Sequence, residues 1–158
     1  MNIDSFEQLT IRVGCLQLKR CGSIPTLTIF VIYSPTSNYD EEEVEAFYMD
    51  LEKFYKEDHT FFKVIIGCFS ARIEPRGTSE DRYIGTHALE WNEQGERLSE
   101  FIMATKTIYG NSQFQKPHPQ RWTCESSSGE YHNEIDHIIV NRKFCLADVA
   151  VHSKFYPG

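Results

Sequence analysis

Hydrophobic and polar residues follow two different spacings along the chain. Apolar residues alternate with more polar ones from 9 to 15, and this alternation predicts a strand with one buried face. A dense run of β-branched and aromatic residues from 27 to 33 predicts a second strand, buried on both faces or nearly so. Glycine and proline mark a turn within residues 22–25. The two strands are therefore expected to form a hairpin that ends at Pro35.

Helical spacing replaces the alternation after residue 40. Asp40 followed by Glu43 is a capping-box-like helix start. The helix expected at 41–57 has acids and lysines on one face and apolar or aromatic side chains on the other. The apolar or aromatic face carries Val44, Phe47, Tyr48, Leu51, Phe54 and Tyr55. A second helix is expected to begin after Asn92, and its inner face would carry Leu98, Phe101 and Ile102.

The remaining segments predict further strands around these helices. Residues 61–66 predict a buried strand that ends at Gly67, and residues 70–90 predict a loop. Later strands are expected at 107–109, 121–124, 135–140 and 148–155. Strands that alternate with two helices, some of them joined as hairpins, indicate an α+β (mixed α/β) fold built in layers. No internal repeat or linker is found, so residues 1–158 are expected to form a single domain.

Composition narrows the class of protein. The formal net charge is −7, from 16 basic and 23 acidic residues, and a nucleic-acid binder usually has a basic excess. An acidic protein can still act on phosphodiesters where a metal ion and local cations offset its charge. The chain has no apolar run of about 20 residues, no apolar signal-peptide core and no Cys-x-x-Cys pair. These features predict an intracellular protein that does not span a membrane, with its five cysteines reduced.

One candidate site lies where a predicted buried strand ends. Residues 67–70 read Gly-Cys-Phe-Ser and follow the strand expected at 61–66. The backbone leaves the sheet at such a point, so side chains there often carry function. The alternative is a plain turn with a buried thiol, because free cysteine is among the most buried residue types.

A second candidate is Asp136, in the strand predicted at 135–140. A carboxylate in a buried strand is costly unless it meets a donor, a cation or a metal; the alternative is that Asp136 faces solvent. His137 would face the other side of the strand and is more simply interpreted as a structural histidine than as a catalyst. A zinc site made of Cys124, His132 and His137 has spacings that fit no strong motif.

Five segments occur in a familiar order: Ile32-Tyr33-Ser34-Pro35, Gly67-Cys68-Phe69-Ser70, Asn92-x-x-Gly95-x-x-Leu98-x-x-Phe101, Arg121-Trp122-Thr123 and Ile135-Asp136-His137-Ile138. In this order they resemble the endonuclease/exonuclease/phosphatase domains, the DNase I-like nucleases. The resemblance is closest to the endonuclease region of non-LTR retrotransposons, which is associated with a reverse transcriptase, and to the craniofacial development protein 2-like family. It extends from about Leu9 onward.

The resemblance implies part of a four-layer α/β/β/α sandwich and an ancestral Mg²⁺-dependent hydrolysis of DNA phosphodiesters. It matches Tyr33 to a tyrosine that reaches the phosphate, and Asp136 to an aspartate that orients the catalytic histidine. Four further residues match the family's substrate-binding region: Asn92, Arg121, Trp122 and Thr123. Asn92 also begins a helix, and its role there is expected to be mainly structural.

The sequence departs from the family pattern at the Gly-Asp-x-Asn turn. Cys68 replaces the aspartate that acts on the attacking water, and Ser70 replaces the asparagine that contacts the phosphate. A thiol is mostly protonated at neutral pH, and sulfur is a poor Mg²⁺ ligand. The family's metal-binding Glu, expected before Leu9, and its Ser-Asp-His motif, expected after Gly158, have no counterpart. The resemblance therefore predicts a domain incomplete at both ends that binds no Mg²⁺ and has lost its activity.

Two other functions stay open. Nuclease activity could remain if the missing segments were supplied by another chain. Alternatively, the chain could be a non-catalytic interaction module, because an unpaired sheet edge can dock a strand or self-associate. DNA is the partner of the family, and binding to this acidic chain is expected to be weak or absent.

Overall fold

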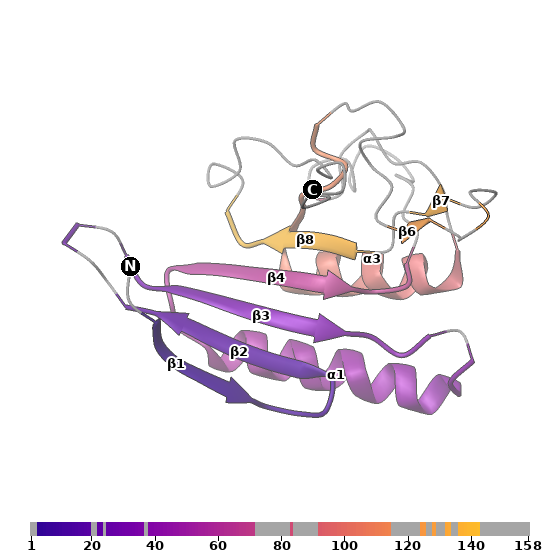
Figure 1. Cartoon of the computed structure of the whole chain (residues 1–158), viewed down its shortest axis with the longest axis horizontal. Coiled ribbons are helices and arrows are strands. Elements are labelled where there is room, and N and C mark those ends of the chain that lie inside the picture. The colour runs from indigo at the N-terminus through magenta and orange to yellow at the C-terminus, as the bar shows by residue number, and fades with distance from the viewer. Residues whose placement is uncertain are drawn as a thin grey trace.

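A computed structural model places two helices against one side of a six-stranded sheet (Figure 1). The structure describes most of the first half of the chain and shorter stretches of the second: residues 3–19, 22–23, 25–36, 38–71, 83, 92–114, 124–125, 128, 132–133 and 136–142. The α+β prediction is confirmed. None of the helices in this part of the chain is long and apolar enough to cross a membrane.

The sheet has the strand order β1-β2-β3-β4-β8-β5. Its strands are β1 (Ile3–Gln8), β2 (Val13–Leu18), β3 (Leu27–Tyr33), β4 (Phe62–Cys68), β8 (Asp136–Val140) and β5 (Ile108–Tyr109). The β3–β4 pair is parallel and the other pairs are antiparallel. A separate short hairpin joins β6 (Cys124–Glu125) to β7 (His132–Asn133). The strands predicted at 107–109 and 135–140 therefore correspond to β5 and β8.

The helices begin where local capping signals predict. Helix α1 (Glu41–Glu57) follows Asp40, whose side chain accepts a hydrogen bond from the Glu43 amide at 2.9 Å. It crosses over from β3 to its parallel neighbour β4, the connection that parallel strands require. Helix α3 (Glu93–Thr105) is capped in the same way by Asn92. Arg97 of α3 joins the two helices through ion pairs with Glu41 and Glu45.

The hydrophobic core lies between the sheet and these helices. Alternate strand residues point toward it, and the apolar stripes of α1 and α3 cover them. Its main members are Val13, Phe30, Ile32, Ile65 and Ile139 from the sheet, and Val44, Phe47, Leu51, Leu98, Phe101 and Ile102 from the helices. The apolar positions predicted for both helices are confirmed at these sites.

The other side of the sheet differs from the prediction. The strand at 27–33 was expected to be buried on both faces or nearly so, yet Val31 is 43% exposed and Tyr33 is 58% exposed. The expectation is wrong because the core and both helices lie on the other side of β3. We call this second surface the open face; apolar side chains dominate it.

The first predicted strand is also displaced. Residues 9–12 form the connection between β1 and β2, and Ile11 is 89% exposed. The Thr10 hydroxyl oxygen accepts hydrogen bonds from the amides of Arg12 and Val13, which closes a tight turn. Strand β1, which precedes this turn, was not predicted. The strand expected at 148–155 and residues 72–82 and 84–90 of the expected loop lie outside the described residues.

The cap of α1 gives a measurable prediction. Asp40→Ala should lower the free energy of unfolding by about 1 kcal/mol, because the Glu43 amide loses its acceptor. Glu42→Ala removes the same charge from the first turn without removing a cap and should change stability by less than about 0.5 kcal/mol. Chemical denaturation of both variants, followed by helix circular dichroism, compares the two losses. Equal losses would contradict the capping argument.

Candidate functional site

Three of the candidate residues lie in one row across three neighbouring strands. Tyr33 of β3 is the register partner of Cys68 of β4, and Cys68 is the register partner of Asp136 of β8. Paired residues on adjacent strands point to the same side of a sheet. Tyr33 and Asp136 are exposed and Cys68 is partly buried. We call these three residues the site row; it lies on the open face, at the edge where β3 and β4 end.

The surface-facing alternative for Asp136 is the one that the structure shows. Its neighbour His137 points to the opposite side, toward the core, and is only 2% exposed. His137 Nε2 lies 2.7 Å from the carbonyl oxygen of Ala71, and Nδ1 lies 2.7 Å from the Tyr109 hydroxyl. A carbonyl oxygen only accepts, so Nε2 carries a proton. Both ring nitrogens are thus engaged inside the fold, which agrees with a structural histidine and removes His137 from the zinc alternative.

The turn after Cys68 is held from three sides. The Ser34 amide donates to the Cys68 carbonyl at 2.8 Å, and the Asn92 side-chain amide donates to the Ser70 carbonyl at 3.1 Å. His137 binds Ala71 as described. Ser70 adopts a positive φ of 51°, which is uncommon for a residue with a side chain. These contacts fix the backbone of the turn that carries Cys68 and Ser70.

Asn92 uses both ends of its amide within the protein. Its oxygen accepts from the Gly95 amide at 2.8 Å and caps α3, while its nitrogen holds the Ser70 carbonyl. Asn92 therefore connects the start of α3 to the turn beside the site row. This geometry supports the mainly structural role expected for it, and a contact with substrate stays a prediction.

Sequence reasoning missed Asn111. This residue is 7% exposed; its side-chain nitrogen donates to the Asp136 carbonyl at 2.9 Å and its oxygen accepts from the Ile138 amide at 2.9 Å. The two bonds continue the sheet pairing beyond the short strand β5 and fix the backbone that carries Asp136. Nothing in the local sequence marks this asparagine, because both partners are distant along the chain. Arg121, Trp122 and Thr123 lie outside the described residues.

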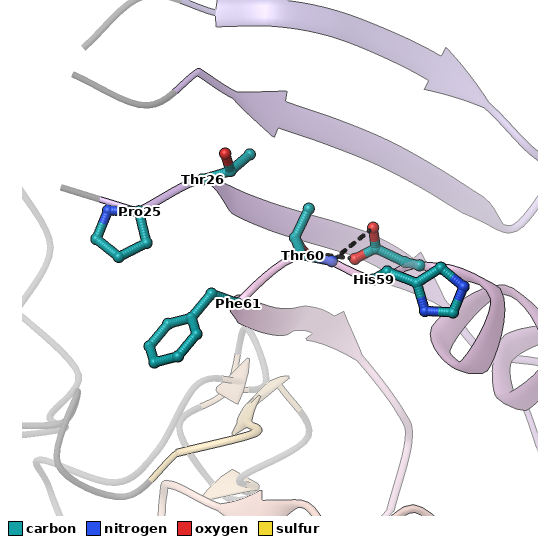
Figure 2. A pocket seen from close by; sticks show the side chains of 6 residues that line it. Pro25, Thr26, His59, Thr60 and Phe61 are labelled. Atoms are coloured by element: carbon teal, nitrogen blue, oxygen red, sulfur yellow. Dashed lines mark hydrogen bonds between the residues drawn. The ribbon is translucent and has the colours of Figure 1, made fainter. Parts of the chain in front are cut away.

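A shallow depression of about 540 Å³ lies at the other end of β3 and β4, lined by Pro25, Thr26, Asp58, His59, Thr60 and Phe61 (Figure 2). Its carboxylate is already satisfied: Asp58 accepts from the Thr60 hydroxyl at 2.7 Å and the Thr60 amide at 3.4 Å. Figure 2 shows His59 and Phe61 on opposite sides of Thr60. The depression is thus a corner between α1 and β4 and is separate from the site row.

The sequence and the fold of this chain were each compared with those of known proteins. A scan against models of protein families finds no match. Craniofacial development protein 2 from Bos taurus is 35% identical over 124 residues, which cover 75% of this chain and 20% of that protein. Craniofacial development protein 2 from Tragulus javanicus is 31% identical over 145 residues, covering 84% and 24%. The chain thus spans about a fifth to a quarter of the length of these relatives.

Two solved structures are similar to this chain. The endonuclease domain of TRAS1, a telomere-specific non-LTR retrotransposon, matches with a TM-score of 0.48 at 9% identity, over 80% of this chain and 48% of that one. An endonuclease/exonuclease/phosphatase family protein from Leptotrichia buccalis matches with a TM-score of 0.52 at 10% identity, over 89% of this chain and 51% of that one. This chain shares the fold of that second structure, a DNase I-like fold.

DNase I-like proteins generally depend on a metal ion, so the fit of the site row to Mg²⁺ bears on its chemistry. Among the described residues, no three His, Cys, Asp or Glu side chains gather closely enough to hold a metal ion. The row offers one carboxylate, from Asp136, beside a thiol and a phenol. Mg²⁺ prefers oxygen ligands in octahedral geometry, usually with one or two carboxylates and substrate oxygens. With sulfur at the central position, these residues do not fit a Mg²⁺ site.

Proposed function

We propose that this chain is a DNase I-like domain of retrotransposon-endonuclease origin in which phosphodiester hydrolysis has been lost. The observation that carries the proposal is the position of Cys68, between Tyr33 and Asp136 in the site row. Three hydrogen bonds hold the backbone of the turn that begins there, and the resemblance matches this turn to the family's catalytic one. The carboxylate that the turn would carry is absent.

The chemistry of a thiol accounts for the loss. The family's aspartate would act on the attacking water as a base and lie near the metal; removing one such group commonly lowers the rate about 10²–10⁴-fold. A thiol is a poor Mg²⁺ ligand and does not replace a carboxylate base, and the Ser70 side chain is shorter than the asparagine that would reach the phosphate. The net charge of −7 further opposes the approach of a phosphate backbone. Tyr33 and Asp136 remain from the ancestral site.

Supercoiled plasmid nicking tests the proposal. The purified chain, with Mg²⁺ and with EDTA, should nick no more plasmid than a mock-purified preparation. Cys68→Asp combined with Ser70→Asn should not restore activity, because the added carboxylate would have only Asp136 beside it among the described residues of the row. EDTA-sensitive nicking by the unmodified chain would contradict the proposal.

Complementation examines the alternative of a nuclease completed by missing segments. The chain spans about half the length of the solved DNase I-like structures that it matches. If the family's Glu and Ser-Asp-His segments are fused to the ends of the chain, the doubly repaired variant is expected to nick plasmid in the presence of Mg²⁺. The same fusion with Cys68 and Ser70 unchanged is the matched control and should stay inactive. Activity in that control would favour the retained-nuclease alternative.

A further inference from the structure

We draw no further inference here: the strongest candidate, the apolar open face of the sheet around the 43% exposed Val31, carries none because nothing in the described part of the chain shows what covers it.

Discussion

Gly67→Ala is expected to lower the free energy of unfolding by roughly 3–5 kcal/mol, a large share of the stability of one domain. The φ angle of Gly67 is 142°, a conformation that only glycine adopts readily. A Cβ atom there would lie 2.0 Å from the carbonyl oxygen of Ile32 in β3. That oxygen belongs to the backbone of the neighbouring strand, so β3 and β4 would have to separate where they carry Tyr33 and Cys68.

Gly22 provides the matched control. Its φ angle is 58°, also positive, but a Cβ atom there would meet nothing within 4 Å. Gly22→Ala should therefore cost only about 1 kcal/mol, the conformational part of the effect. At about 2–4 °C per kcal/mol, the melting temperature at one fixed protein concentration should fall by roughly 6–20 °C for Gly67→Ala and by a few degrees for Gly22→Ala. Equal shifts would contradict the close approach of the two strands.

The elements that were predicted accurately have local signals. Helix α1 occupies the expected residues 41–57 because Asp40 meets its partner only three residues away. Asn92 caps α3 through the same short-range bond, to Gly95. Such signals depend on the geometry of a single turn of helix, so no knowledge of the rest of the fold is needed to interpret them.

The first strand pair shows where periodicity fails. Apolar residues alternate from 9 to 15, but the chain turns between 9 and 12, and Ile11 faces solvent. Hydrogen bonds from the Arg12 and Val13 amides to the Thr10 hydroxyl oxygen stabilise that turn. An alternating pattern contains no information on whether the backbone continues straight. In strand β1, apolar and polar residues do not alternate cleanly, and a bulge between Ile3 and Ser5 shifts its pairing register with β2.

The predicted burial of β3 was wrong for a different reason. The run from 27 to 33 is apolar on both faces, as it would be in a sheet between two layers. The described elements supply one layer, so Val31 remains 43% exposed. The apolar residues of this run correctly indicate a surface that would be stabilised by packing against another layer. What covers it lies beyond the described contacts.

The site row was only partly accessible from sequence. Motif order indicated Tyr33, Cys68 and Asp136, but their adjacency depends on the parallel β3–β4 pair and on β8 lying next to β4. Asn111 and His137 were not linked to this region, because their contacts join residues 25 and 66 positions away in the chain. Local patterns do not reveal pairings over such distances.

His137→Phe is expected to lower the free energy of unfolding by roughly 2–5 kcal/mol, because two buried groups lose their hydrogen-bond partner. The Ala71 carbonyl and the Tyr109 hydroxyl each lie 2.7 Å from a ring nitrogen of His137. Phenylalanine keeps the aromatic contact with Phe69 but offers neither a donor nor an acceptor. His59→Phe, at an exposed position, is the matched control and should change stability by less than about 0.5 kcal/mol.

A double-mutant cycle separates the two bonds of His137. In a Tyr109→Phe background the hydrogen bond between residues 109 and 137 is already gone, so His137→Phe should cost about 1 kcal/mol less than in the unmodified chain. Urea denaturation of the four proteins at one fixed concentration gives this coupling directly. The remaining loss belongs largely to the Ala71 carbonyl, and hence to the turn that carries Cys68 and Ser70. If the loss were the same in both backgrounds, the Tyr109 hydroxyl would contribute nothing, and His137 would stabilise the fold through that turn alone.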